Sequence, residues 1–263
     1  MPYRVDFRHA DNDALDRLVE LGALDVESSL DGMAALLPDS VTPEQLATAL
    51  GVKAITVSHA VGRDAGSVWI LSPRPISIGR LRIVPAHREH APGTVRLIDA
   101  SAFGTGLHPT TALCLEVLQE IVRIAPPDAV LDMGTGSGVL ALAALTLGVP
   151  RALAIDLDGD ALRVAASNAR LNRLAERLQL ARGGPESILG TWPLVLANVL
   201  AAPLIEMAPA LVRRVGHRGQ LVLSGIPSSV EPDVDQAYRR LGMHRVNAVW
   251  RAGWVALVFQ ASW

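Results

Sequence analysis

The sequence predicts an α/β protein in which a large, mainly parallel sheet follows a small α+β unit. Three patterns along the 263 residues support this prediction. Apolar strand candidates alternate with helices from about residue 96, which is typical of a parallel sheet covered on both faces. The final two strand candidates are joined by a short turn and should pair antiparallel. The first 62 residues follow a different order, βαββαβ.

The N-terminal unit, residues 1–62, is expected to be a ferredoxin-like domain. Strands are predicted at "YRVDFR", on both sides of Asp31-Gly32 in "LDVESSLDGMAALLP", and at "KAITVSH". Between them, "DNDALDRLVELGA" and "TPEQLATALG" have the pattern of amphipathic helices. The second helix has a clear start, because Thr42 can cap it and Pro43 suits its first position.

The remaining chain divides into a linker, residues 63–95, and a larger domain, residues 96–263. The linker is rich in proline and glycine, with one strand candidate at "GRLRIVPA". Strands of the large domain are predicted at "AVLDM", "RALAIDL", "LQLAR", "PLVLANV", "GQLVLSG", "HRVNAVW" and "WVALVFQ". Helices are expected between the first five of these, and the last two form the antiparallel pair.

Composition excludes several classes of protein. With 24 basic and 26 acidic residues, the net charge of −2 argues against a non-specific nucleic-acid binder. Cys114, the single cysteine, lies in an apolar run and is expected to be a buried core thiol. One cysteine permits neither a disulfide within the chain nor a cysteine-based metal site. We expect a soluble, cytoplasmic protein with no membrane span and no metal.

A glycine-rich turn follows the first strand of the large domain. "AVLDMGTGSGVLALAA" places Asp132, Gly134, Gly136 and Gly138 between a strand and a helix. Glycines there allow a sharp turn and a close approach of the backbone to a ligand. The dinucleotide fingerprint G-x-G-x-x-G is absent, because Val139 stands where its last glycine is required. A structural turn is the alternative to a binding loop.

Two polar residues end the second and the fourth predicted strands of the large domain. Asp156 ends "RALAIDLD", at a distance that suits a carboxylate that accepts hydrogen bonds from both ribose hydroxyls of a nucleoside. Its alternative role, capping the next helix, can be filled by Asp158 or Asp160. Asn198 ends "PLVLAN" and is either a helix cap or a substrate contact that orients an amine nucleophile. A nucleoside site without the pyrophosphate fingerprint points to S-adenosylmethionine.

The motifs together resemble one family. "SAFGTGLHPTTALCLEVL", "VLDMGTGSGVLALAALTLG", "AIDLDGDALRVAASNARLN", "LVLANVLAAPLIEMAP" and "GQLVLSGI" are similar to the bacterial ribosomal protein L-eleven methyltransferases of the PrmA type. The resemblance covers residues 96–263 and weakens in the linker, where Trp69 stands in a mild "SVWILSP". It implies a class I, seven-stranded, Rossmann-like methyltransferase sheet and an N-terminal domain that presents the protein substrate.

The resemblance also implies an activity and a site. The activity is transfer of methyl groups from S-adenosylmethionine to lysine side-chain and N-terminal amines of that large-subunit ribosomal protein. Asn198 is the expected catalytic residue. The expected cofactor-binding residues are Phe103, Thr110, Thr111, Gly134, Gly136, Asp156 and Asn198. No direct nucleic-acid binding, membrane or metal is expected.

The stretch "FGTGLHPTT" separates this family from other methyltransferases. Its helix start should be capped by Thr110 or Thr111, next to Pro109. The residues before it are expected to cover the cofactor, with Phe103 over apolar surface and Thr111 near the methionine carboxylate. His108 is expected to be a turn or capping residue, with a general base as its alternative.

Three other functions compete with this interpretation. A related class I methyltransferase would act on a different protein lysine or a small-molecule amine, but a small-molecule enzyme needs no separate docking domain. A nicotinamide oxidoreductase is disfavoured by Val139. A catalytically inactive binding module is disfavoured by the intact "DMGTGSG", "IDLD" and "ANVLA".

Overall fold

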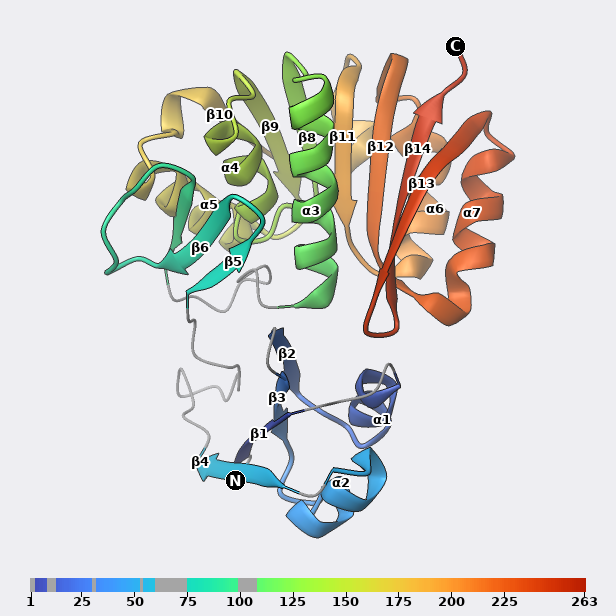
Figure 1. The fold of residues 1–263 in the computed structure, drawn as a ribbon. Coiled ribbons are helices and arrows are strands. Elements are labelled where there is room, and N and C mark those ends of the chain that lie inside the picture. The colour runs from blue at the N-terminus through green and yellow to red at the C-terminus, as the bar shows by residue number, and fades with distance from the viewer. Residues whose placement is uncertain (1–2, 9–12, 30–31, 53, 60–74, 99–107) are drawn as a thin grey trace.

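The computed structural model describes residues 3–8, 13–29, 32–52, 54–59, 75–98 and 108–263. These residues form a four-stranded sheet near the N-terminus, a three-stranded sheet and a seven-stranded sheet (Figure 1). Within these ranges no helix is long and apolar enough to span a membrane.

The N-terminal unit has the predicted βαββαβ order. Its elements are β1 (Tyr3–Phe7), α1 (Ala14–Glu20), β2 (Asp25–Ser29), β3 (Gly32–Leu37), α2 (Pro43–Leu50) and β4 (Ile55–His59). The sheet order is β2-β3-β1-β4 and every neighbouring pair is antiparallel. Thr42 caps α2 as predicted, because its hydroxyl accepts the Gln45 N–H while the Gln45 side chain accepts the Thr42 N–H. A separate apolar cluster fills the space between sheet and helices.

The seven-stranded sheet confirms the predicted fold class. Its strands are β8 (Ala129–Met133), β9 (Arg151–Asp156), β10 (Leu178–Arg182), β11 (Trp192–Asn198), β12 (Val215–Pro227), β13 (Met243–Arg251) and β14 (Trp254–Ala261). They lie in the order β10-β9-β8-β11-β12-β14-β13. The first five run parallel, whereas β14 is antiparallel to both β12 and β13. The antiparallel hairpin is therefore as predicted.

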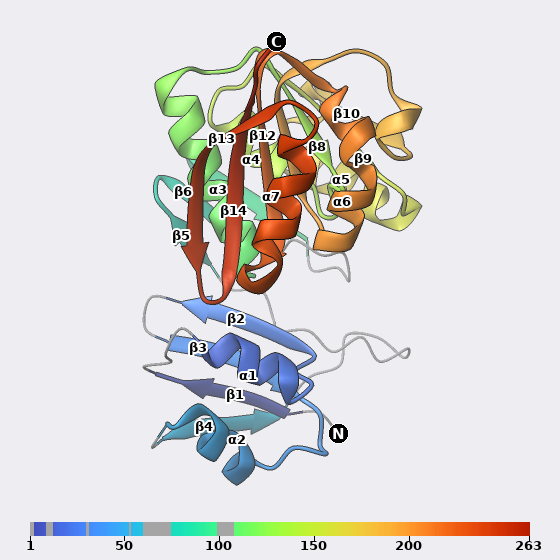
Figure 2. The same cartoon turned by 90° about the vertical axis from the view of Figure 1, so that its right-hand side faces the viewer.

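Helices cover both faces of this sheet (Figures 1 and 2). One face carries α3 (Pro109–Ile124), α4 (Val139–Thr146) and α5 (Gly159–Leu171), and the other carries α6 (Ala201–Val212) and α7 (Glu231–Arg239). Side chains alternate between the faces, so that Val130 joins one apolar cluster and Leu131 the other. Short 3-10 helices are η1 (Ala175–Arg177), η2 (Pro185–Ser187) and η3 (Ser228–Val230). The sequence interpretation did not include α7.

The three-stranded sheet lies within the region expected to be a linker. It consists of β5 (Ile76–Ile78), β6 (Leu81–Pro85) and β7 (Thr94–Leu97), in that order. Only the strand at β6 was expected. Leu81, Ile83 and Val95 lie in the same apolar cluster as the buried side chains of α3 and α4. This sheet therefore packs on the large domain.

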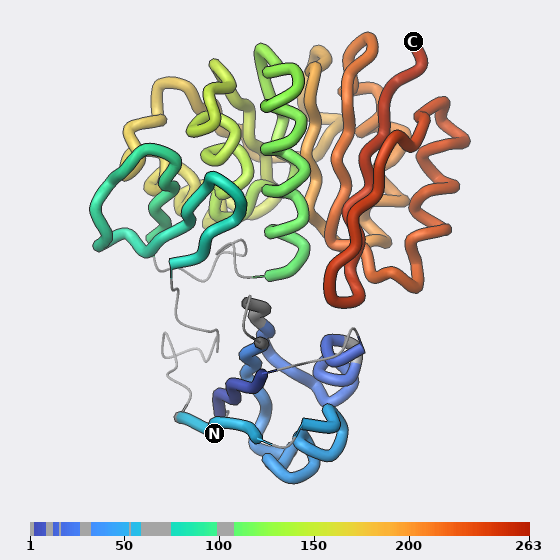
Figure 3. Tube along the Cα trace, viewed as in Figure 1, coloured from blue at the N-terminus to red at the C-terminus, as the bar shows by residue number. Residues whose placement is uncertain are grey.

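The turn of the hairpin β13–β14 points toward the N-terminal unit (Figures 1 and 3). Ala252 and Trp254, at the tip of the hairpin, pack against the N-terminal apolar cluster. Trp254 also packs against the cluster under α3. One side chain thus contacts both parts of the molecule.

Candidate functional site

The glycine-rich turn joins β8 to α4 with three left-handed residues. The φ angles of Gly134, Gly136 and Gly138 are 68°, 54° and 84°, a region that other residues adopt only at a cost. A Cβ added to Gly134 would lie 2.4 Å from Cγ1 of Val199, in the loop after β11. At Gly134 the backbone of the turn therefore passes too close to the loop after β11 to leave room for a side chain.

Asp156 connects the end of β9 to this turn. Its Oδ2 accepts a hydrogen bond from the Gly136 N–H at 2.9 Å, and its Oδ1 accepts one from the Asp158 N–H at 3.0 Å. Asp158 caps α5 by accepting the Asp160 N–H at 2.8 Å. Because capping is done by Asp158, the Asp156 carboxylate remains at the edge of the sheet beside the glycine-rich turn.

Asn198 lies at the end of β11, adjacent to the strand that carries the turn. Its Nδ2 donates to the Thr111 hydroxyl at 3.2 Å. Its Oδ1 is buried and accepts no hydrogen bond from any described residue. The side chain makes no cap hydrogen bond to α6, whose N-cap is Leu200. Asn198 thus presents a buried acceptor that a donor from outside the chain can satisfy.

The loop that carries Asn198 is held between two backbone segments. On one side, Cγ1 of Val199 occupies the space that a Cβ of Gly134 would need. On the other side, a Cβ on Gly225 of β12 would lie 2.2 Å from the Val199 carbonyl oxygen. Gly225 has a φ of 84° and lies where the β12–β14 register shifts. This close packing fixes Asn198, and the sequence interpretation found neither Val199 nor Gly225.

The start of α3 is capped by His108. Its Nδ1 accepts the Thr110 N–H at 3.3 Å and lies 2.8 Å from the Thr110 hydroxyl. The expected cap, Thr110 or Thr111, was wrong because both residues lie inside the first turn and are buried. Pro109 occupies the first turn as expected. The capping role of His108 agrees with the expectation from the sequence that it is a turn or capping residue.

The environment of His108 keeps its ring neutral. Burial lowers the pKa of His108 to about 4. Because Nδ1 accepts the Thr110 N–H, the neutral ring carries its proton on Nε2. The ring also packs edge-on against Trp254, with a centroid distance of 5.1 Å. A histidine with this pKa is a weak base at neutral pH.

Two further buried groups lie behind the turn. The Asp132 Oδ2 accepts hydrogen bonds from the Thr135 hydroxyl at 2.6 Å and the Ala141 N–H at 3.2 Å. Burial raises the pKa of Asp132 to about 6, and the nearby charge of Asp156 adds to this. Cys114 is buried, as expected of a core thiol. Burial raises its pKa to about 12, so the thiol is not a nucleophile at neutral pH.

Four of the seven expected site residues form two contacting pairs. The first is Gly136 with Asp156, and the second is Thr111 with Asn198. Thr110 is turned away from both, since its hydroxyl contacts His108 and its carbonyl accepts the Ser224 hydroxyl at 3.1 Å. Other expected residues are placed as follows: Gly134 lies beside Val199, and Phe103 lies outside the described residues.

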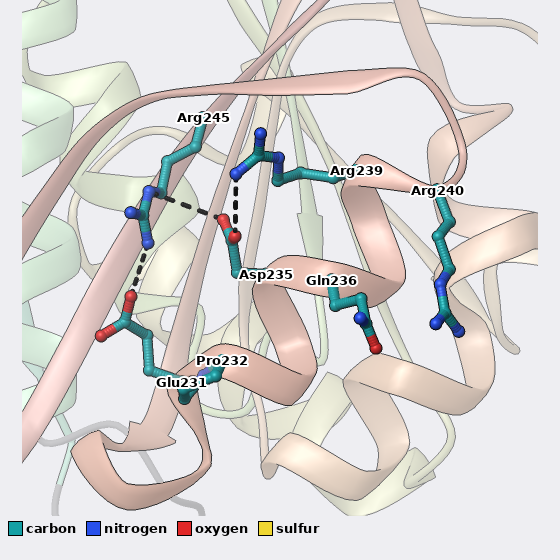
Figure 4. A pocket seen from close by; sticks show the side chains of 7 residues that line it. All are labelled: Glu231, Pro232, Asp235, Gln236, Arg239, Arg240 and Arg245. Carbon is teal, nitrogen blue, oxygen red and sulfur yellow. Dashed lines mark hydrogen bonds and ion pairs between the residues drawn. The ribbon is translucent and has the colours of Figure 1, made fainter.

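A separate hollow of about 650 Å³ lies between α7 and β13 (Figure 4). Four of its charged side chains pair with one another. Arg245 contacts Glu231 at 2.5 Å and Asp235 at 3.5 Å, and Arg239 contacts Asp235 at 3.5 Å. The two pairs of Arg245 link the edge strand β13 to α7, whereas the Arg239–Asp235 pair lies within α7. The hollow contains none of the expected site residues.

Among the described residues, no group of three or more histidine, cysteine, aspartate or glutamate side chains could hold a metal ion.

Residues 17–262 match the family described as ribosomal protein L11 methyltransferase (PrmA). A relative of that name from Pelobacter propionicus is 36% identical over 255 residues, which cover 94% of this chain and 79% of the relative. One from Geobacter sulfurreducens is 37% identical over 269 residues, with 97% and 88% covered. The crystal structure of the ribosomal protein L11 methylase from Lactobacillus delbrueckii subsp. bulgaricus is similar with a TM-score of 0.65. It has 30% sequence identity, and the match covers 71% of this chain and 97% of that one.

Proposed function

The chain belongs to the ribosomal protein L11 methyltransferase family, and from this premise we propose its substrates and the roles of its residues. It transfers methyl groups from S-adenosylmethionine to lysine side-chain and N-terminal amines of ribosomal protein L11. The observation that supports this most directly is the buried, unpartnered Oδ1 of Asn198 at the carboxyl edge of the sheet.

The glycine-rich turn and Asp156 form the cofactor site. Bound S-adenosylmethionine supplies a methyl carbon that its positive sulfur already activates for displacement. The Asp156 carboxylate accepts hydrogen bonds from ribose hydroxyls, while the three left-handed glycines let the backbone approach the ligand. The Gly136 N–H that donates to Asp156 keeps the carboxylate oriented toward the turn.

Asn198 orients the amine that is methylated. Its Oδ1 accepts a hydrogen bond from the amine N–H, which directs the nitrogen lone pair toward the methyl carbon. The Thr111 hydroxyl accepts from Nδ2 and fixes which way the amide faces. The close packing of Val199 between Gly134 and Gly225 holds this acceptor rigidly.

The amine must lose a proton before it attacks. A lysine side chain has an ordinary pKa of about 10.4, and a site that excludes water and holds a positive sulfur lowers it. Solvent takes the proton. His108 does not act as the base, because its pKa is about 4 and its Nδ1 is committed to the cap of α3.

The chain divides into a docking unit, residues 1–62, a connecting segment, residues 63–95, and a methyl-transfer domain, residues 96–263. The separate apolar cluster of the N-terminal unit supports this division. The packing of β5–β7 on α3 and α4 fixes residues 76–97 to the methyl-transfer domain. The N-terminal unit binds the ribosomal protein, in the cytoplasm, without direct contact to nucleic acid.

The test is incubation of the chain with labelled S-adenosylmethionine and unmethylated large-subunit ribosomal proteins, followed by mass spectrometry. We expect label on lysine and N-terminal amines of L11. The variant Asn198→Ala should bind S-adenosylhomocysteine but transfer label at a greatly reduced rate. Label on another protein or on a small amine, with none on L11, would instead favour the related class I methyltransferase.

A further inference from the structure

The buried face of α5 lies directly against the glycine-rich turn. Its buried residues are three alanines and two asparagines: Ala161, Ala165, Ala169, Asn168 and, just past the helix end, Asn172. The alanines allow close approach, since a Cβ on Gly138 would lie 3.1 Å from the Cβ of Ala165. The asparagines are 1% and 3% exposed, so their amides must find partners inside the protein.

Asn172 satisfies the open edge of β7. Its Oδ1 accepts the Arg96 N–H at 2.8 Å, and its Nδ2 donates to the Arg96 carbonyl oxygen at 2.7 Å. Among the described strands, β7 lies at the edge of its sheet and pairs with β6 alone. Asn172 therefore takes the place of a neighbouring strand, as a buried edge requires. Its Nδ2 also donates to the backbone carbonyl oxygen of Asn168 at 2.8 Å, a bond within the end of the helix. These partners serve the fold.

Asn168 uses its amide differently. Its Oδ1 accepts the Ile98 N–H at 2.8 Å, which continues the edge of β7. Its Nδ2 donates to the carbonyl oxygen of Ser137 at 2.8 Å. Ser137 belongs to the glycine-rich turn and follows Gly136, whose N–H donates to Asp156. One side chain thus links β7 to the turn that carries the cofactor site.

We propose that Asn168 is a positioning residue for cofactor binding, a role that rests on the proposed function. By holding the Ser137 carbonyl, it fixes the peptide planes of the turn, and with them the Gly136 N–H that orients the Asp156 carboxylate. An amide suits this role because it donates and accepts at the same time. Asn172 is the natural control, because it is equally buried and supports the same strand but does not contact the turn.

The experiment compares Asn168→Ala with Asn172→Ala in the full chain. Both variants should lower Tm, because each leaves buried backbone groups unpaired. Only Asn168→Ala should weaken binding of S-adenosylhomocysteine, by about tenfold, the factor that corresponds to one lost buried hydrogen bond. Calorimetric titration measures both affinities. Equal affinities for the two variants would overturn the proposal, whereas absence of binding by the unmodified chain would overturn the proposed function itself.

A second measurement needs no variant and therefore does not depend on whether Asn168→Ala folds. Amide hydrogen exchange is followed in the unmodified chain with and without S-adenosylhomocysteine. The ligand should slow exchange at Gly136 and, through Asn168, at Ile98. Exchange at Arg96, which Asn172 holds, should change much less. Protection of Gly136 without any effect on Ile98 would show that the two segments are not coupled and would refute the proposal.

Discussion

Asp156 and His108 are two polar residues near the candidate site, and they have different roles. The Asp156 carboxylate faces the glycine-rich turn and accepts two backbone N–H groups from the described residues, which leaves lone pairs for the proposed ribose hydroxyls. The polar atom Nδ1 of His108 is turned back into its own helix start. The contrast supports the proposed ligand role of Asp156 and gives His108 a role in local structure.

We therefore expect Asp156→Ala to weaken binding of S-adenosylhomocysteine far more than His108→Ala does. The loss of a charged acceptor for two ribose hydroxyls should raise Kd by at least about tenfold. His108→Ala should mainly lower Tm, since loss of an N-cap costs about 1 kcal/mol. Calorimetric titration and thermal unfolding of both variants check this, and similar rises in Kd would contradict the assigned roles.

The buried ring of His108 should also make stability depend on pH. Its pKa is about 4 in the folded chain and 6.5 in the unfolded chain. Between these values only the unfolded chain takes up the proton, so acidification favours unfolding by about 1.4 kcal/mol for each pH unit. The contribution of the neutral His108 ring to the stability of the folded chain is complete above pH 6.5, and it is lost as the pH falls toward 4.

The variant His108→Asn should lack this loss, because asparagine is a good N-cap that does not titrate. Comparing the two chains cancels the contributions of other titrating groups to the pH dependence of stability. One of these is Asp132, whose raised pKa makes acidification favour the folded chain. Unfolding free energies measured from pH 8 to pH 4 should show the unmodified chain losing stability relative to the variant. Parallel curves would mean that the folded ring titrates normally.

Among the elements, the glycine-rich turn is the one whose conformation constrains the site most. Gly134→Ala should lower both stability and affinity for S-adenosylhomocysteine. An alanine at this position would have to adopt the left-handed conformation, which costs about 1–3 kcal/mol. Its Cβ would also lie 2.4 Å from Cγ1 of Val199. Displacement of the turn would also move the Gly136 N–H that orients the Asp156 carboxylate, which is the expected cause of the weaker binding.

Gly148→Ala provides the matched control for this change. Gly148 also has a positive φ, of 106°, but an added Cβ there has no neighbour within 4 Å. The control should lower Tm and leave the affinity unchanged. If both variants bind the ligand equally well, contact with Val199 has no role in shaping the site.

Sequence patterns predicted elements whose signals are local. The cap of α2 follows from the order of Thr42 and Pro43, and the seven strands follow from apolar runs. α7 was missed because its sequence, "EPDVDQAYR", is mostly polar, and only Val234 and Tyr238 are buried. β5 and β7 were missed because strands of three and four residues carry too little pattern.

The site residues likewise divide into those with a local sequence signal and those that only tertiary packing brings to the site. Asp156 and Asn198 were predicted as site residues because polar side chains at strand ends are a local signal, and their ligand contacts stay a prediction. The close approach of Val199 to Gly134 and Gly225 is made only by tertiary packing. Likewise Asn168 meets Ile98 across 70 positions of the chain, and nothing in "ASNARLN" distinguishes it from an ordinary helical asparagine.

At the level of the whole molecule, the separate N-terminal cluster predicts that binding of cofactor and of protein can be separated. Deletion of residues 1–62 should leave affinity for S-adenosylhomocysteine nearly unchanged, because the contacts described around Asp156 and Asn198 all lie in residues 108–263. Methylation of L11 should be lost with the docking surface. Titration and labelling of the shortened chain, beside the full chain, measure the two properties. Unchanged methylation of L11 would remove the N-terminal unit from substrate recognition.

The position of β14 has a consequence for how the chain is made. β14 lies between β12 and β13, although both precede it in the sequence. While the ribosome is still adding residues 254–261, β12 and β13 have no partner on the sides that β14 will occupy, and unpaired edges invite association with other chains. Because β14 pairs with both β12 and β13, the sheet is complete only once residues 254–261 have been added. The free edge of β12 is therefore open to association with other chains between translation of β12 and translation of β14.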